Sequence, residues 1–228
     1  MKPISSKSED ENCLEDIGRA SLQIVHDLKN QLNGLKLYAT FLRKRLEKSK
    51  GSGDELETII KLIAGIDRAA EDLSLLTDYS QPPTPRKQFA VELQKTLNAA
   101  VANINADAAN TTAIVMEAGS RELMAELDAG MITEAFKSIT QGAARILKNR
   151  KQDGPLKIQL TEQRNENGGD AVIDWHIPDA FDHDPFRSFA GSSEIRMALA
   201  AKMIEAHGGA AEKRDGTLRV RLPLTNQG

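Results

Sequence analysis

The segment LEDIGRASLQIVHDLKNQLNGLKLYATFLRKRL, residues 14–46, decides the architecture of the first third of the chain. Small and apolar side chains recur in it at alternating spacings of four and three residues, which is the period of one helix face. The members of this stripe are Leu14, Gly18, Ser21, Val25, Leu28, Leu32, Leu35, Ala39, Leu42 and Leu46. We therefore expect one long amphipathic helix with a seam like that of a coiled coil.

A second stripe with the same spacing follows the turn KSKGSGD, residues 48–54. Its members are Leu56, Ile59, Ile63, Ile66, Ala70 and Leu73. The short turn predicts a second helix that returns antiparallel to the first. Further apolar positions widen both faces beyond what two helices cover: Leu22, Ile24, Leu37, Ile60, Leu62 and Leu76. The pattern predicts that two copies of the chain close a four-helix bundle.

Three prolines in QPPTPRK, residues 81–87, end the helical pattern, because proline disfavours helix at and before its own position. Beyond them, predicted helices cover 91–108, 131–147 and 193–207, and predicted strands cover 112–118, 156–160, 171–177 and 217–224. We therefore expect an α+β chain with four parts. These are a tail (1–10), a dimerising antiparallel helical hairpin (11–80), a linker (81–87) and an α/β sandwich domain (88–228).

Composition narrows the possible partners. The formal net charge is -3, with Lys and Arg interleaved among Asp and Glu, so no basic stripe suits nucleic acid and no polybasic patch suits a membrane. No run approaches the roughly 18 apolar residues of a spanning helix. Cys13 is the only cysteine, which excludes an internal disulfide and fits the reducing cytoplasm.

Two stretches resemble the core of histidine kinases. HDLKNQLNGL, residues 26–35, is similar to the family's phosphoacceptor box, in which His is followed by an acidic residue and, four positions on, by Asn or Thr. AAKMIEAHGGAAEKRDGTLRVRLPL, residues 200–224, resembles the closing helix, His-Gly-Gly corner and final strand of the ATP-binding domain. The resemblance covers nearly the whole chain after the first ten residues. It implies a phosphoacceptor hairpin followed by a kinase-like body.

The body departs from that family where the nucleotide would bind. Ser138 and Gly142 stand where the family has two asparagines, one of which holds magnesium. IPDAFDHDPF, residues 177–186, offers Asp179 or Asp182 to read adenine but contains no glycine for the lid.

At the family's second glycine motif, before Met197, this chain has Glu194 and Arg196, which oppose docking of a triphosphate. These losses, taken with the resemblance, imply a degenerate body that does not use ATP and no cofactor of its own. The chain then resembles the histidine phosphotransferases of bacterial phosphorelays, and the magnesium is expected from a partner.

The chemistry is predicted to reside at His26, Asp27 and Asn30. His26 follows the seam residue Val25, so its ring is expected on the exposed flank of the helix. A neutral imidazole can attack phosphorus directly, and a neighbouring carboxylate can hold its other nitrogen in the donor tautomer. We assign the nucleophile to His26, ring orientation to Asp27 and positioning of phosphate or water to Asn30.

The predicted partners are a second copy of the chain, a response-regulator receiver domain and an upstream hybrid histidine kinase. Three alternatives stay open: a response-regulator phosphatase, a pseudokinase adaptor using the surface around Glu194 and Arg196, and a divergent sensor kinase. The other histidines are not expected to take part in the chemistry. His207 is interpreted as a structural residue at a helix end, and His176 and His183 as solvated residues rather than metal ligands. Trp175 alternates with Ile173 and Ile177, so it is expected in the core.

Overall fold

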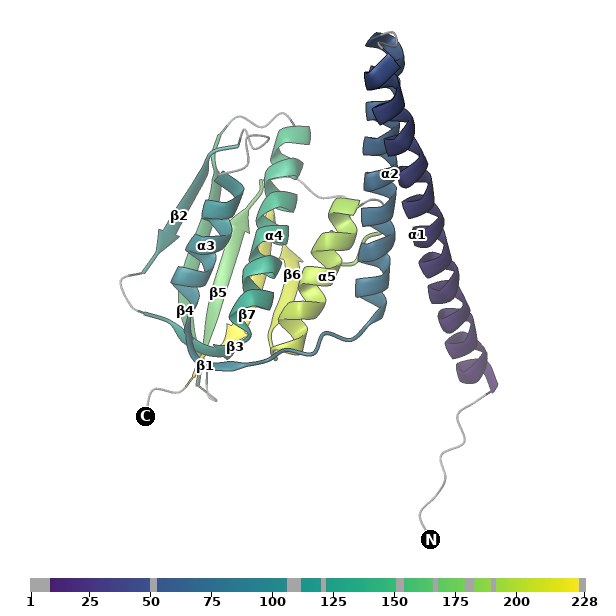
Figure 1. Ribbon diagram of the computed structural model, residues 1–228. Helices are drawn as coiled ribbons and strands as arrows, with labels where there is room; N and C mark the ends of the chain where they lie inside the picture. The colour runs from purple at the N-terminus through teal and green to yellow at the C-terminus, as the bar shows by residue number, and fades with distance from the viewer. Residues whose placement is uncertain are drawn as a thin grey trace. The chain divides into compact units, whose positions relative to one another are not determined.

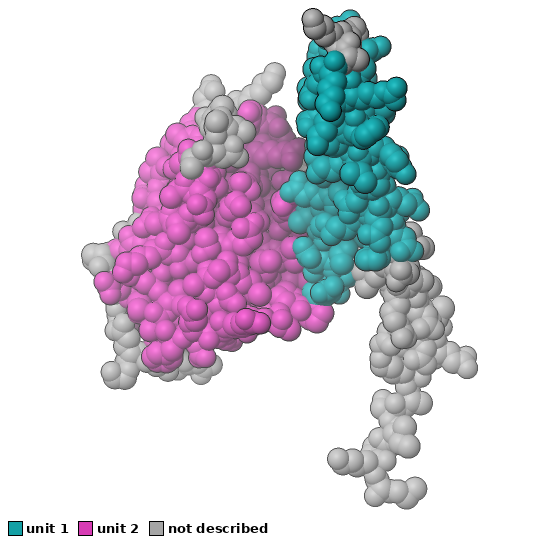
Figure 2. Space-filling view, viewed as in Figure 1, with its two compact units in different colours: residues 1–81 teal, residues 82–228 magenta. Residues whose placement is uncertain are grey.

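The structure is a computed structural model that describes residues 9–49, 53–105, 112–119, 122–150, 154–165, 168–178, 183–189 and 192–225. Side chains are described from Val25 onward. The chain divides into two compact units, residues 1–81 and 82–228 (Figure 2). It mixes helices with sheets, as the sequence predicted (Figure 1). The expected tail, 1–10, falls largely outside the described residues, because the first helix begins at Glu9.

The first unit consists of α1 (Glu9–Ser49) and α2 (Gly53–Ser80), which run antiparallel and pack against each other (Figure 1). Among the described residues of α1, the apolar side chains that are not exposed recur every seven positions, which marks one side of the helix as the contact side. They are Val25, Leu32, Ala39 and Leu46. Lys36 Nζ forms an ion pair with Asp67 Oδ1 at 2.7 Å, so these two residues lie at the same height along the two helices.

The second unit is built on a five-stranded sheet with the order β2-β4-β5-β7-β6 (Figure 1). Its strands are β2 (Ile114–Ala118), β4 (Leu156–Asn165), β5 (Gly168–His176), β6 (Ala210–Arg214) and β7 (Thr217–Pro223). Only β2 and β4 pair in parallel, and the other neighbours are antiparallel. Two short strands, β1 (Gln88–Glu92) and β3 (Met124–Leu127), form a separate antiparallel pair.

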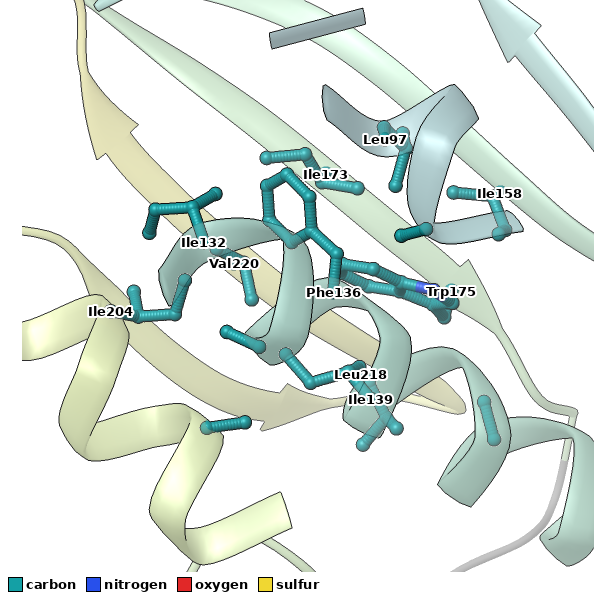
Figure 3. Close-up of a cluster of buried hydrophobic side chains, with 14 of the residues drawn as sticks. Leu97, Ile132, Phe136, Ile139, Ile158, Ile173, Trp175, Ile204, Leu218 and Val220 are labelled. Atoms are coloured by element: carbon teal, nitrogen blue, oxygen red, sulfur yellow. The ribbon is translucent and has the colours of Figure 1, made fainter. Parts of the chain in front are cut away.

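Three helices lie on one face of this sheet: α3 (Leu93–Asn105), α4 (Ala129–Asn149) and α5 (Ser192–Ala206) (Figure 1). Their apolar sides meet the alternate residues of the central strands in one core (Figure 3). Trp175 and Phe136 are fully buried there, with ring centroids 6.0 Å apart. The Trp175 indole N–H donates to Thr140 Oγ1 at 2.9 Å, so its polar atom is satisfied. The expectation that Trp175 lies in the core is confirmed.

Several predicted elements need correction. The helix expected over 91–108 is preceded by β1, and the helix itself starts at Leu93. Leu93 and Leu97 fit a helix period, and no glycine or proline separates them from Val91, so the strand before the helix was not recognised. That strand is irregular, with a bulge and a positive φ of 62° at Ala90. The short strands β3 and β6 were not predicted. Neither MAEL nor AAEKR contains a β-branched residue, so their strand character comes from pairing within the fold.

Candidate functional site

His26 lies on the exposed side of α1, next to the half-buried Val25. Its side chain is 64% exposed, and that of Asp27 is 57% exposed. Asn30 follows one helical turn later, which places its amide beside the imidazole. The three residues predicted to carry the chemistry therefore share one open stretch of helix surface. Lys29 is less exposed than its three neighbours His26, Asp27 and Asn30.

Both polar contacts of the His26 ring are made by Nδ1. Asp27 Oδ1 lies 3.4 Å from this nitrogen and Asn30 Nδ2 lies 3.3 Å from it. A carboxylate oxygen accepts, so the first contact needs a proton on Nδ1. An amide nitrogen donates, so the second contact needs a lone pair there. Rotating the Asn30 amide would present its oxygen instead and satisfy both contacts with the Nδ1–H tautomer.

That tautomer has a direct chemical consequence. With the proton held on Nδ1, the lone pair of the neutral ring is on Nε2. Neither described contact uses Nε2, so this atom is available to an incoming electrophile. The arrangement is that of an oriented, solvent-accessible nitrogen nucleophile.

The body contains a close contact at Gly142, the position where the histidine kinases that the sequence resembles have an asparagine. Gly142 is buried in α4, and Met197 of α5 packs directly over it. A Cβ atom built on Gly142 would lie 2.2 Å from Met197 Sδ and 2.8 Å from Met197 Cγ. The missing side chain of Gly142 therefore makes room for the thioether of α5.

The N-terminal turn of α5 carries Glu194 and Arg196, the residues that replace glycines in the resemblance. The Glu194 carboxylate lies 3.5 Å from His183 Nε2 in the loop before the helix. In that loop Phe186 is buried against the core, and Asp184 Oδ1 accepts its backbone N–H at 3.0 Å. The two candidate adenine-reading residues, Asp179 and Asp182, lie outside the described residues. Among the described residues, no group of three or more His, Cys, Asp and Glu side chains is arranged to hold a metal.

Asp128 connects three separate segments of the body. It caps α4, where Oδ1 accepts the Met131 N–H at 3.0 Å, and its Oδ2 accepts the Arg86 N–H at 2.9 Å. These two hydrogen bonds hold the pKa of the Asp128 carboxyl below its usual value, in that order of importance. The Asp128 backbone N–H donates to His207 Nε2 at 3.0 Å.

His207 is fully enclosed at the end of α5. Its Nδ1 donates to the Met203 carbonyl at 2.7 Å, so both ring nitrogens are satisfied by the neutral ring. Gly208 follows with a φ of 80°, the left-handed conformation that ends the helix. The interpretation of His207 as a structural residue fits this geometry. Its pairing with Asp128 was missed, because the two residues are 79 positions apart and no local pattern links them.

Comparisons with known proteins point to one fold. No family model matches the chain, and no curated protein matches it. The crystal structure of full-length ShkA in complex with AMPPNP matches with a TM-score of 0.64 and 16% sequence identity, covering 90% of this chain and 46% of that one. The histidine kinase AdeS of Acinetobacter baumannii matches with a TM-score of 0.51 and 13% identity, covering 84% of this chain and 96% of AdeS.

The chain therefore has a histidine-kinase-like fold, and it spans about half the length of ShkA. Identities this low establish the fold and leave the activity to the residues of the site. None of the helices in the described part of the chain is long and apolar enough to cross a membrane.

Proposed function

We propose that this chain is a dimeric histidine phosphotransfer protein of a two-component phosphorelay. It would exchange a phosphoryl group between His26 and the aspartate of a receiver domain, without using ATP. The observation that carries the proposal is the exposed imidazole of His26, whose Nδ1 lies beside Asp27 and Asn30 and whose Nε2 remains available.

This chain and the receiver domain together supply every group that the transfer step needs. The Nε2 lone pair attacks the phosphorus of the receiver's aspartyl phosphate in line with the bond to the carboxylate oxygen. The N–P bond forms as the O–P bond breaks, and the aspartate leaves as a carboxylate. The ring becomes cationic, and the Asp27 carboxylate beside Nδ1–H stabilises that charge. The reverse transfer follows the same path. The receiver supplies the magnesium that neutralises the phosphoryl oxygens.

The proposed dimer follows from apolar side chains that α1 and α2 leave uncovered. Leu28, Leu35 and Leu42 are exposed and recur every seven residues along α1. Leu62 and Leu76 are exposed on α2. Leu28 lies three positions after the contact residue Val25, and Leu62 lies three positions after Ile59. At about 100° per residue, each leucine is therefore rotated by the same angle from its contact residue. In an antiparallel pair these two offsets fall on the same side, so both helices present one apolar face to a second copy.

The body supports the proposal through the contact between α4 and α5. Met197 occupies the space above Gly142, where the resemblance places a magnesium ligand. An asparagine side chain at position 142 would have to displace this thioether, and a triphosphate bound as the resemblance implies would have to accept Glu194 near its phosphates. We therefore propose that the body has a structural role and that phosphate reaches His26 from another protein.

A divergent histidine kinase is the second candidate, favoured by the match to ShkA, which was crystallised with AMPPNP. The two candidates differ in the source of the phosphate. The test is to supply radiolabelled phosphate to the purified chain either as ATP with magnesium or as a phosphorylated receiver domain of the same genome.

We expect label from the receiver and none from ATP. Label from ATP alone would establish the kinase. If the receiver loses its phosphate to water equally well with the unmodified protein and with His26→Ala, the chain is a phosphatase. If the chain binds the receiver and leaves its phosphate unchanged, it is an adaptor.

A further inference from the structure

The linker between α2 and β1, residues 81–87, is short and rich in proline. Positions 82, 83 and 85 are prolines, whose rings fix φ, and Thr84 is restricted because a proline follows it. Residues 82–85 therefore form a stiff segment. Arg86 and Lys87 carry no such restriction, so a joint that included them would bend more freely.

The backbone of Arg86 is held by the body. Its N–H donates to Asp128 Oδ2 at 2.9 Å, although the two residues are 42 positions apart. The other carboxylate oxygen, Oδ1, accepts the Met131 N–H at 3.0 Å. The hydrogen bond from Met131 lowers the pKa of the Asp128 carboxyl most and that from Arg86 comes next, so the acceptor is charged at neutral pH. A hydrogen bond to a charged acceptor is stronger than one between neutral groups.

Asp128 is itself fixed within the body. Its backbone N–H donates to Nε2 of the buried His207 at 3.0 Å, and its carbonyl accepts the Ile132 N–H at 3.0 Å. The preceding residue, Leu127, lies opposite Gln88 in the pairing of β3 with β1. The contact between Asp128 and Arg86 therefore extends this pairing toward the linker by means of a side chain.

We propose that Asp128 is a clamp that fastens the linker to the body and confines the joint between the two units to the stiff segment 82–85. With the clamp closed, Arg86 and Lys87 are held by the body at both ends. With the clamp open, these two residues would join the linker and loosen it. The clamp is independent of the transfer proposed at His26, because it concerns only the freedom of the joint.

The variant Asp128→Asn tests the clamp, because it separates the helix cap from the linker contact. Asparagine is as good an N-cap as aspartate, so its oxygen can still accept the Met131 N–H. Its second polar atom is an NH2 group, which cannot accept the Arg86 N–H. Asp128→Ser is the second variant, since serine also caps well and its single hydroxyl is too short to reach the linker. The matched control is Asp184→Asn, in a loop of the body where Asp184 Oδ1 accepts a backbone N–H at 3.0 Å.

Hydrogen exchange followed by NMR on the full chain measures the contact itself, with the Met131 amide as an internal reference for the cap. We expect exchange of the Arg86 amide to become at least about tenfold faster in both Asp128 variants, as loss of a hydrogen bond to a charged group predicts. Exchange of the Met131 amide should change little. Asp184→Asn should leave both amides as they are in the unmodified protein.

Nitrogen relaxation on the same samples measures the joint. In the unmodified protein we expect the helix pair and the body to have nearly the same rotational correlation time. In both Asp128 variants the body should tumble distinctly faster than the helix pair. Unchanged exchange at Arg86 in Asp128→Asn and Asp128→Ser would overturn the clamp. Faster exchange at Arg86 without a change in the relative tumbling of the two units would also overturn it, because the joint would then be confined by something other than Asp128.

Discussion

The helix pair and the body differ in the exposure of their large apolar side chains. In the body, the core residues of α3, α4, α5 and the sheet are buried almost completely, and among its described residues only Phe89, Val115 and Phe189 are large, apolar and exposed. In the helix pair, leucines, isoleucines and aromatic residues stay exposed on both sides of the contact between α1 and α2. The body is a self-sufficient core, whereas the helix pair has surfaces that other chains can complete.

We therefore expect contacts with partners at the helix pair rather than at the body. Contacts inside the body contribute to its stability. The buried polar side chains of its described residues have hydrogen-bond partners, and Met197 fills the space beside Gly142. The uncovered surfaces of the helix pair divide by helical phase into two faces. One carries His26, and the other, the leucine face, consists of Leu28, Leu35, Leu42, Leu62 and Leu76. One predicted assembly and one predicted chemistry thus occupy opposite sides of the same two helices.

The largest effect is expected from a charge placed on the leucine face. Leu35→Asp should convert the dimer into a monomer and lower the helical content of the α1–α2 pair, because an isolated carboxylate in an apolar interface is costly. Light scattering and circular dichroism measure both changes. Leu37→Asp is the matched control, since it lies on the His26 side and should leave the dimer intact. A monomeric unmodified protein would contradict the division of the two faces.

The next largest effect is expected from a side chain added at Gly142, where Met197 occupies the available space. Gly142→Ala places a Cβ against Met197 and should destabilise the body by about 1–3 kcal/mol, as overpacking of a core does. Gly130→Ala is the matched control in the same helix, where the new Cβ meets only Asp128 Oδ1 at an ordinary 3.5 Å. Removing a flexible glycine there should be neutral or slightly stabilising. Equal melting temperatures for the two variants would show that α5 does not press on Gly142.

The smallest effect is expected at Asp128, and it depends on pH. Because hydrogen bonds lower its pKa in the folded state, Asp128 contributes stability that is complete above the pKa of the unfolded chain, about 3.9. This contribution is lost as pH falls through the lower folded-state pKa.

Asp128→Ala should therefore cost about 1 kcal/mol at neutral pH, the usual value of a helix cap. The difference from the unmodified body should shrink below about pH 4, which denaturant unfolding at several pH values can follow. Asp128→Asn keeps a good cap without the charge and should lose less. A pH-independent difference for Asp128→Ala would show that the carboxylate charge is not involved.

Sequence alone predicted the elements whose signals are local and strong. The stripes of α1 and α2 repeat over many turns, and the helices α4 and α5 and the strand β7 end close to their predicted limits. The open stretch at His26, Asp27 and Asn30 follows from spacing along a single helix. The short strands β1, β3 and β6 could not be predicted in this way, because their hydrogen bonds come from residues distant in the chain.

The same limit applied to the contacts within the body. The contacts of Met197 with Gly142 and of His207 with Asp128 join residues that are 55 and 79 positions apart. The sequence also could not predict which ring nitrogen of His26 makes the polar contacts. Spacing places Asp27 and Asn30 near the ring, but only the structure shows that both approach Nδ1.

The central claim is that His26 carries the phosphoryl group, and mapping the label by mass spectrometry tests it most directly. After incubation with a phosphorylated receiver domain, we expect an acid-labile, base-stable phosphate on His26. We expect no label on His176, His183 or His207, and none on the His26→Ala protein, which should remain folded and dimeric. Label retained in His26→Ala, or mapped to one of the histidines of the body, would contradict the account.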